Sequence, residues 1–326
     1  MKSFAQIGAA GFVAPRHMRA IKETGNALVA ACDPYDGVGV IDSYFPGASF
    51  FTEYERFDRH VEKLKRRGQP IDFFSICSPN YLHDAHVRFA LRYGASAICE
   101  KPLVLNPWNL DALEEMEKEC EGNIYNILQL RHHPVIRNLK KNSIAAKSAE
   151  KKEIDLTYIT SRGKWYYTSW KGNPLKSGGV ATNIGIHFFD MLIWLFGRVE
   201  QVEVHQRTHD RASGFLELEK ARVKWFLSIH GDTLPESSKR SGKTTYRSIQ
   251  MDGEELEFSK GFEDLHTVSY REIIAGRGFT IADARPSIEL VHQIRNQELL
   301  PESNNTHPLV GLPLVPHPFE VRKTQK

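Results

Sequence analysis

The first 130 residues alternate short apolar runs with amphipathic segments, and this alternation restricts the fold more than any other feature of the chain. Apolar runs separated by helical patterns are typical of strand and crossover-helix units that build a parallel sheet. The expected strands are 4–7, 28–32, 73–77, 96–99 and 124–128, and the expected helices are 15–24, 53–67, 83–93 and 108–120. The pattern predicts a doubly wound parallel sheet over residues 1–130.

After residue 130 the apolar pattern changes its period. Apolar and more polar side chains alternate from Val223 to Ile229, and a period of two is typical of antiparallel strands with one covered face. Similar runs lie at 155–160, 202–206, 215–218, 248–251 and 256–258. We therefore predict an α/β chain of two domains, in which residues 131–326 carry a largely antiparallel open sheet and end in an extended, proline-rich tail.

The composition excludes several classes of protein. With 41% hydrophobic and 25% charged residues, the 326-residue chain has an ordinary globular mix. The 43 Lys and Arg residues against 40 Asp and Glu residues leave a net charge of +3, which is too even to indicate a nucleic-acid or membrane-surface protein. The most hydrophobic stretch, 188–196, is shorter than the roughly 20 apolar residues of a spanning helix. We expect a soluble protein with neither nucleic acid nor membrane as a partner.

The cysteines favour a reducing compartment. None of the four forms a Cys-x-x-Cys pair, and Cys32, Cys77 and Cys99 lie inside apolar runs. Such thiols behave as small buried hydrophobic groups rather than as nucleophiles. The N-terminal segment is a poor signal peptide because Gln6 and two glycines interrupt it. We therefore expect a cytoplasmic location.

Residues 8–14 (Gly-Ala-Ala-Gly-Phe-Val-Ala) join the first predicted strand to the first predicted helix. Read as the dinucleotide-binding pattern G-x-G-x-x-G/A, the register is Ala9, Gly11 and Ala14, and only the middle glycine is retained. Gly11 lets the backbone approach a pyrophosphate, which the helix N-terminus then faces. A tight turn without any ligand also needs glycine, so the pattern alone is weak.

Asp33 strengthens the interpretation of this loop. It follows the second predicted strand, 22 residues after Gly11, near the spacing of about 20 at which a carboxylate binds the adenosine ribose hydroxyls. An exposed strand-end aspartate is the alternative. No cation follows Asp33 to bind a 2′-phosphate, so NAD is favoured over NADP. The residues of this region expected to contact NAD are Gly11, Phe12, Val13, Ala14 and Asp33.

Two further motifs carry a family resemblance. Glu100-Lys101-Pro102 follows the predicted strand 96–99, at the sheet edge where ligands bind in such folds, and Gly185-Ile186-His187-Phe188-Phe189-Asp190 lies in the second domain. Over residues 1–300 the chain resembles the family that includes glucose–fructose oxidoreductase and inositol dehydrogenase. The resemblance implies a Rossmann domain, an α/β domain whose open sheet forms oligomer contacts, and an active site between them. It also implies a homo-oligomer, either a dimer or a tetramer.

A finer match lies at 9–17, 42–46, 264–267 and 284–290. These segments look like those of bacterial UDP-N-acetylglucosaminuronate 3-dehydrogenases, which begin diacetamido-mannuronate synthesis for lipopolysaccharide O-antigen. The resemblance implies NAD-dependent oxidation of the C3 hydroxyl of a UDP-sugar. The alternatives are a dehydrogenase of another sugar, inositol or uronate, and a nicotinamide-binding regulator without turnover.

Lys101 and His187 are the expected catalytic residues. Oxidation of an alcohol needs a cation beside the developing alkoxide and a base for its proton, and an imidazole has an ordinary pKa of about 6.5. A surface lysine and a core histidine are the alternatives that spacing alone favours. Many relatives carry aspartate four residues before this histidine, whereas Asn183 stands here. Because asparagine cannot take a proton, a Lys101 and His187 pair is the simpler interpretation.

Other candidate residues surround these two. Further cofactor contacts are expected from Ser78, Pro79, Asn80, His83, Glu100, Lys101 and Gln129. The segment 162–179 is dense in cations and aromatic residues, which suits an anionic nucleotide sugar, although an edge-strand aromatic cluster is an equal alternative. The expected substrate contacts are Lys101, Arg131, Lys164, Tyr166, Tyr167, Ser177, Gly178, Asn183 and His187. We expect no metal, because no Cys or carboxylate set completes a four-ligand site.

Overall fold

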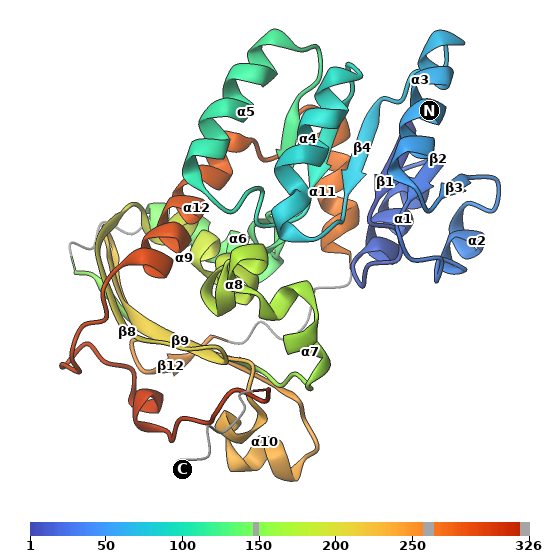
Figure 1. Cartoon of the computed structure of the whole chain (residues 1–326). Helices are drawn as coiled ribbons and strands as arrows, with labels where there is room; N and C mark the ends of the chain where they lie inside the picture. Colours follow the sequence, from blue (N-terminus) through green and yellow to red (C-terminus); the bar gives the residue numbers. More distant parts are fainter. Residues whose placement is uncertain (146–149, 257–263, 320–326) are drawn as a thin grey trace. The chain divides into compact units, whose positions relative to one another are not determined.

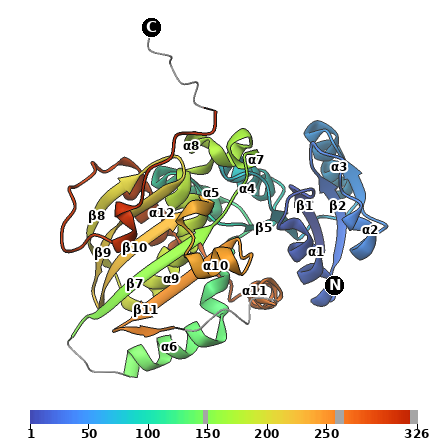
Figure 2. The same ribbon diagram turned by 90° about the horizontal axis from the view of Figure 1, so that it is seen from below.

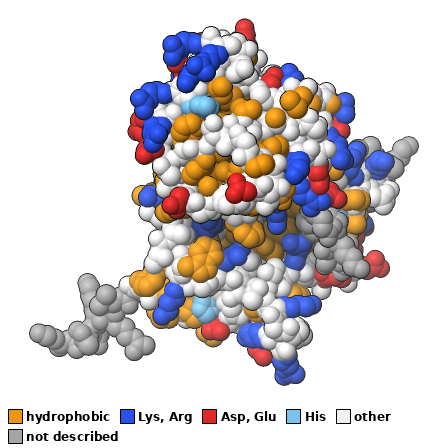
Figure 3. Space-filling view, turned by 90° about the vertical axis from the view of Figure 1, so that its right-hand side faces the viewer, with side chains coloured by type: hydrophobic (Ala, Val, Ile, Leu, Met, Phe, Trp, Pro, Cys, Tyr) orange, Lys and Arg blue, Asp and Glu red, His pale blue; other side chains and the backbone are white. Residues whose placement is uncertain are grey.

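The computed structural model describes residues 1–145, 150–256 and 264–319. Contacts divide the chain into two compact units, one made of Met1–Arg137 with Gly261–Glu289, the other of Asn138–Lys260 with Leu290–Lys326. The strand expected at 256–258 lies mostly outside the described residues. Figure 1 shows the elements of each unit, and Figure 3 shows that basic and acidic side chains are interspersed over one face.

The first unit contains a parallel six-stranded sheet in the order β3-β2-β1-β4-β5-β6. Its strands are β1 (Ser3–Ile7), β2 (Ala27–Cys32), β3 (Ser49–Phe51), β4 (Phe73–Ile76), β5 (Ser96–Cys99) and β6 (Ile124–Asn126). This order is that of the doubly wound Rossmann sheet. In such sheets the strand order reverses between β1 and β4, and a crevice lies at the carboxyl ends of these two strands. The predicted fold class is confirmed for this unit.

Helices cover both faces of this sheet. They are α1 (Ala14–Glu23), α2 (Val40–Tyr44), α3 (Tyr54–Arg66), α4 (His83–Arg92), α5 (Pro107–Glu119) and α11 (Leu265–Ile274). Phe57 of α3 and Phe89 of α4 contact Phe74 of β4, whereas α11 packs against α1, which also contacts α2. Right-handed crossovers produce these two layers, because connections that run in opposite directions along the sheet lie on opposite faces.

The second unit contains a mixed sheet that is mostly antiparallel, in the order β12-β11-β7-β10-β9-β8 (Figure 2). Its strands are β7 (Lys152–Thr160), β8 (Val199–Arg207), β9 (Arg211–Leu218), β10 (Ala221–Ser228), β11 (Thr245–Met251) and β12 (Glu254–Glu255). Among the described strands of this second sheet, β7 and β10 form the only parallel pair. The alternating pattern over 223–229 arises because successive side chains of β10 point to opposite faces of the sheet.

Helix α9 (Ile186–Phe196) packs on one face of this sheet. The Phe189 ring meets the buried Trp225 ring edge to face, with centroids 5.2 Å apart. A Cβ on Gly185 would lie 2.5 Å from a Leu227 methyl carbon, so only glycine allows the start of this helix to approach β10 so closely. Shorter helices precede and follow it: α7 (Trp165–Thr168), α8 (Pro174–Ser177) and α10 (Glu236–Arg240).

One helical stretch among the described residues, Pro174–Phe196, is long and apolar enough to cross a membrane by length and composition. It exceeds the expected run 188–196 because α8 and the π-helical segment η4 (Ala181–Gly185) continue into α9. The core helix of a soluble protein passes the same test, and 72% of the most apolar 18-residue window of this stretch is buried. Length and composition are therefore weak evidence for a span.

The boundary between the units differs from the expected division at residue 130. Residues up to Arg137 belong to the first unit, and the chain returns to it with Gly261–Glu289 before it ends in the second. The return is caused by burial, because Tyr270 of α11 is fully buried and joins the hydrophobic core of the parallel sheet. Local periodicity describes an amphipathic helix but not the sheet on which it packs.

The start of the proline-rich tail is held on the second unit by a buried arginine. Arg211 donates to the Asp210 carboxylate at 2.9 Å and to the carbonyl oxygens of Leu312 and Pro313 at 3.3 and 3.1 Å. The tail also contains the turn η6 (Pro308–Gly311). This part of the tail therefore packs on its own chain.

Replacing Arg211 by Leu is expected to lower the thermal-unfolding midpoint clearly. The change leaves the Asp210 carboxylate buried without its cation, and breaking such a pair costs about 3–5 kcal/mol. Calorimetry of Arg198→Leu, which removes an ion pair from a side chain that is 86% exposed, supplies the control with a midpoint close to wild type. Equal midpoints for the two variants would contradict the buried anchor.

Candidate functional site

The loop after β1 has the geometry of a dinucleotide-binding turn. Gly8 has φ +88°, and a Cβ there would lie 2.5 Å from the Ser78 backbone nitrogen. The Gly8 N–H donates to the Cys32 carbonyl at 2.8 Å, which ties the loop to the end of β2. Only glycine fits this position, so the tight-turn glycine is Gly8 and precedes the expected register at Ala9 by one residue.

Gly11 and the residues after it lead into α1. A Cβ on Gly11 would lie 3.1 Å from the Gly8 carbonyl oxygen, so this turn is closely packed as well. Ala14 is fully buried at the start of α1, whereas Phe12 is 89% exposed and lies 5.7 Å from the Arg16 guanidinium carbon. The positive end of the helix dipole at this N-terminus suits an anion such as a pyrophosphate.

Asp33 is buried beside the loop with both carboxylate oxygens used. Oδ2 accepts the Ala10 N–H and Oδ1 accepts the Tyr35 N–H, each at 2.9 Å. The carboxylate thus connects the dinucleotide loop to the end of β2. A carboxylate oxygen accepts more than one hydrogen bond, so the same oxygens can also accept the ribose hydroxyls of a bound dinucleotide.

His83 connects two strand-end segments. Its Nδ1 lies 2.7 Å from the Pro102 carbonyl oxygen and its Nε2 lies 2.8 Å from the Ser78 carbonyl oxygen. Burial lowers the pKa of His83, although both carbonyl groups act in the opposite direction. Ser78 in turn hydrogen-bonds His86 through its hydroxyl at 2.8 Å. Both nitrogens face carbonyl oxygens, which only accept, so a protonated His83 joins the loop after β4 to the turn that follows Lys101, whereas the neutral ring donates to one of the two carbonyls.

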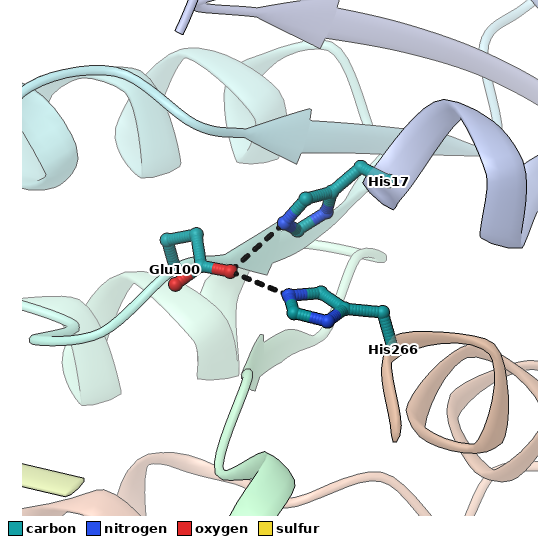
Figure 4. Close-up of side chains that lie close together, drawn as sticks. All are labelled: His17, Glu100 and His266. Carbon is teal, nitrogen blue, oxygen red and sulfur yellow. Dashed lines mark hydrogen bonds and ion pairs between the residues drawn. The ribbon is translucent and has the colours of Figure 1, made fainter. Parts of the chain in front are cut away.

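Glu100 lies at the centre of a buried polar cluster (Figure 4). Its Oε1 accepts from His17 Nε2 of α1 at 2.9 Å and from His266 Nε2 of α11 at 3.0 Å. Burial favours the neutral carboxyl, but the two imidazole donors outweigh it and hold the pKa of Glu100 well below its ordinary value. A buried carboxylate is thus kept ionised next to Lys101.

The cluster continues into the sheet through two hydroxyl groups. Tyr270 of α11 and Ser75 of β4 lie 2.8 and 3.0 Å from His17 Nδ1, and their oxygens are 2.8 Å apart. Burial lowers the pKa of His17, with the hydrogen bond to Glu100 opposing it. A neutral His17 fits the contacts of both ring nitrogens, because Nε2–H donates to Glu100 while Nδ1 accepts from one of the two hydroxyls.

Lys101 follows β5 and is half-buried. Its backbone N–H donates to Glu100 Oε2 at 3.3 Å, and the Lys101–Pro102 peptide bond is cis. Gln129, on the turn η2 (Gln129–His132) after β6, has a buried Oε1 for which the described residues supply no hydrogen-bond partner. An acceptor of this kind fits the amide group of a nicotinamide.

Arg131 makes contacts that the sequence interpretation did not include. Its guanidinium donates to the Asp283 side chain at 2.9 Å and to the Asp283 carbonyl at 2.8 Å, and it stacks on Phe279. Asp283 lies in the first turn of α12 (Ile281–Asn296). Arg131 therefore fastens the returning segment to the first unit, and these bonds use part of the capacity that we expected a substrate to use.

In the second unit, the structure brings Tyr166 and Asn183 together. The Asn183 side-chain nitrogen donates to the Tyr166 hydroxyl at 2.8 Å, and burial raises the pKa of the Tyr166 phenol. Asn183 lies in the π-helical segment η4, and His187 follows four residues later on α9, where it is half-buried. Single-turn π-segments occur often at functional sites, which supports the choice of these residues.

Other candidates in the second unit have structural contacts. Ser177 is fully buried and donates to the Asn173 carbonyl, and a Cβ on Gly178 would lie 2.6 Å from Thr182 side-chain carbons. Tyr167 contacts the His317 ring of the tail at 5.1 Å, whereas Lys164 is exposed. These contacts explain the local folding of the segment, and the binding roles of its residues stay predictions.

Several residues of the Glu100 cluster were missed as site residues: Ser75, His17, His266 and Tyr270. His17 and His266 end or lie inside the segments 9–17 and 264–267 that carry the finer family match, which is the signal that could have indicated them. Among the described residues, His17, Glu100 and His266 also form a group whose possible metal-ligand atoms all lie within 4.8 Å of one another. Their separations of 2.9 and 3.0 Å are those of hydrogen bonds.

Two family models match the chain. Residues 2–126 match the NAD-binding Rossmann fold of an oxidoreductase family, and residues 151–312 match the C-terminal alpha/beta domain of the same family. The chain belongs to the glucose–fructose oxidoreductase and inositol dehydrogenase family. The cofactor is NAD, as predicted, and the chain is an NAD-dependent oxidoreductase.

Solved structures are similar over nearly the whole chain. A WlbA (WbpB) dehydrogenase from Thermus thermophilus in complex with NAD and alpha-ketoglutarate is 52% identical with a TM-score of 0.92, over 95% of this chain and 100% of that chain. The same dehydrogenase in complex with NAD and UDP-GlcNAcA is 51% identical with a TM-score of 0.91, over the same shares of the two chains.

Curated relatives match over shorter segments. A D-glucoside 3-dehydrogenase from Escherichia coli is 26% identical over 142 residues, which is 41% of this chain and 39% of that protein. Two further relatives are matched over 36% and 49% of their own length. The chain thus spans less than half of each of these relatives.

Asp33→Asn is expected to raise the Kd for NADH by about 10- to 100-fold, because a hydrogen bond to a charged group contributes about 1.5–3 kcal/mol. Titration of NADH fluorescence measures this change. Asp36→Asn removes the charge of an exposed carboxylate three residues away and serves as the matched control. Equal affinities of both variants would show that Asp33 only caps the strand.

Proposed function

We propose that the chain oxidises the C3 hydroxyl of UDP-N-acetylglucosaminuronate and releases the 3-keto sugar. The observation that carries this proposal is the similarity, at 51% identity over 95% of the chain, to a dehydrogenase crystallised with NAD and UDP-GlcNAcA. A match of this extent includes both units, so it covers the segments expected to bind cofactor and sugar. Another sugar, inositol or a uronate is the alternative substrate.

Lys101 and His187 act on the reacting hydroxyl in this proposal. Bound NAD supplies the acceptor for the hydride that leaves the sugar carbon. The Lys101 ammonium group donates a hydrogen bond to the hydroxyl oxygen and stabilises the negative charge that develops there. The His187 imidazole accepts the hydroxyl proton, so charge does not accumulate on the alkoxide.

The second unit is proposed to bind the anionic substrate. Tyr166 and Asn183 share a hydrogen bond, and a phenol and a side-chain amide are polar groups that suit the hydroxyl groups of a sugar. Lys164 is exposed on the same segment and is a candidate for the uronate carboxylate. Lys171 is a weaker candidate, because its ammonium lies 4.4 Å from the Trp170 ring centroid and burial lowers its pKa.

The chemistry of the product indicates which class of reaction follows this one. A 3-keto sugar is the substrate class of an aminotransferase, so we infer a role in making diacetamido-mannuronate for lipopolysaccharide O-antigen. Cys32, Cys77 and Cys99 are buried free thiols, which suits a cytoplasmic enzyme. A homo-oligomer, dimer or tetramer, remains part of the proposal.

A 2-oxo acid is a candidate second substrate. The Thermus thermophilus relative was crystallised with NAD and alpha-ketoglutarate. Reduction of that keto acid to its 2-hydroxy acid would take up the hydride and one proton, which regenerates oxidised cofactor without its release. Adding alpha-ketoglutarate to the assay therefore belongs to the test of function.

Mixing enzyme, NAD and UDP-N-acetylglucosaminuronate is expected to raise the absorbance of reduced nicotinamide, and alpha-ketoglutarate is expected to remove that signal while product accumulates. Lys101→Ala and His187→Ala are each expected to lower the rate at least about 100-fold, since each removes an electrostatic or proton-transfer contribution. Lys118→Ala removes an exposed lysine of α5 and is expected to keep the wild-type rate. Full activity of both active-site variants would refute the assigned roles.

Protection by UDP separates nucleotide sugars from free sugars. A ligand that binds the folded state stabilises it by mass action, so UDP is expected to raise the unfolding midpoint of the NAD-bound enzyme. No rise with UDP, together with turnover of a free sugar or inositol, would favour the alternative substrate. Tight NAD binding without turnover of any of these compounds would favour a regulator.

A further inference from the structure

The Glu100 carboxylate uses both oxygens to join segments that are far apart in the chain. Oε1 accepts from His17 and His266, and Oε2 accepts the backbone N–H of Lys101. His17 lies in the first turn of α1, directly after the dinucleotide loop, and His266 lies in the first turn of α11. All four residues belong to the first unit.

The cluster has one arrangement of protons that satisfies its central contacts. Both Nε2 atoms face a carboxylate oxygen, which only accepts, so both carry hydrogen. His17 Nδ1 is then an acceptor that faces Ser75 and Tyr270, and these two hydroxyls also contact each other. The His17 ring is therefore fixed from both sides, and its orientation fixes that of the carboxylate.

Apolar packing would fill this position without the cost of burying a charge. His17 and Tyr270 are fully buried, and Glu100 and His266 are 6% and 5% exposed. A fully satisfied buried polar network specifies directions that apolar side chains leave open. Here the specified direction is that of the peptide between Glu100 and Lys101, because the carboxylate accepts from the next residue's amide.

We propose that Glu100, held by His17 and His266, is a positioning residue that fixes the backbone of Lys101 relative to the first turn of α1. Pro102 follows, and His83 holds its carbonyl oxygen, so Lys101 is restrained on both sides. A bound dinucleotide faces the N-terminus of α1. The cluster thereby sets the Lys101 side chain for a cofactor seated on that helix. The inference rests on the proposed role of Lys101 in catalysis.

Hydrogen exchange of the Lys101 amide tests the positioning without any substrate. Pro102 has no amide hydrogen, so peptides that share a start and end at Glu100 or Pro102 differ only by the Lys101 amide. In the NAD-bound enzyme, His266→Leu removes one donor to Glu100 and is expected to speed this exchange at least about tenfold, because local opening becomes easier. His266→Gln restores an N–H donor and is expected to keep exchange near the wild-type rate.

Kinetics supply the second readout. His266→Leu is expected to lower kcat about tenfold with KM changed less than about twofold, since misplacement of a catalytic group affects the transition state more than ground-state binding. Ser269→Ala is the matched control, because Ser269 is buried on the same helix and donates only to the Leu265 carbonyl among the contacts described. This variant is expected to match wild type in both measurements.

Each outcome decides the proposal. Unchanged Lys101 exchange in His266→Leu would overturn it, as would equal effects of His266→Leu and Ser269→Ala. If His266→Leu does not fold, Glu100→Gln replaces it, and unchanged exchange in that variant overturns the proposal equally. One equivalent of metal that is lost in His266→Gln would also overturn it, because the cluster would then be a metal site. Absence of sugar oxidation by wild type refutes the proposed function but leaves the exchange result intact.

Discussion

A single ionised carboxylate, buried at the end of the fifth strand, organises the cofactor half of this enzyme. An uncompensated charge in the interior is costly, so its neighbours must donate hydrogen bonds in fixed directions. Those neighbours come from α1, α11 and the next residue, Lys101. The glycine-containing turn before α1, the returning helix α11 and Lys101 are thus joined by one constraint.

Close backbone approach is the second constraint on the cofactor half. Gly8 adopts a conformation that other residues rarely adopt, and its Cα lies against the backbone of Cys77 and Ser78. The end of β1 thereby meets the end of β4, the pair at which the strand order reverses. His83 and Asp33 then fasten the loops on either side through backbone groups.

The elements of the first unit with strong periodicity were predictable from sequence, and their ends agree with the structure within two residues. In the second unit, β7, β8, β9 and β11 begin three or four residues earlier than expected. Strand β3 and helix α2 were missed, because elements of three and five residues give too short a pattern. Helix α11 (Leu265–Ile274) was not predicted either, and an amphipathic pattern would not have indicated that it packs in the first unit. Family membership was predictable because Glu100-Lys101-Pro102 and the Gly185–Asp190 motif are read directly from the chain. The NAD cofactor was predictable from the loop at 8–14 and from Asp33, which no cation follows.

The polar interior was the least predictable part. The sequence does not show whether a histidine such as His17 is buried or exposed. Only the fold shows that His17 faces the Glu100 carboxylate. Arg131 was expected to bind a ligand, and the structure pairs it with Asp283, 152 residues further along the chain. Long-range pairs of this kind depend on the tertiary fold, so spacing along the sequence contains no signal for them.

Identifying the sugar carbon from which the hydride leaves tests the proposed reaction most directly. UDP-N-acetylglucosaminuronate deuterated at C3 is incubated with enzyme and NAD, and mass spectrometry of the reduced cofactor locates the label. The account predicts one deuterium in the nicotinamide ring from C3-labelled substrate and none from C4-labelled substrate. Label that remains in the sugar while cofactor is reduced, or that comes from C4, would contradict it.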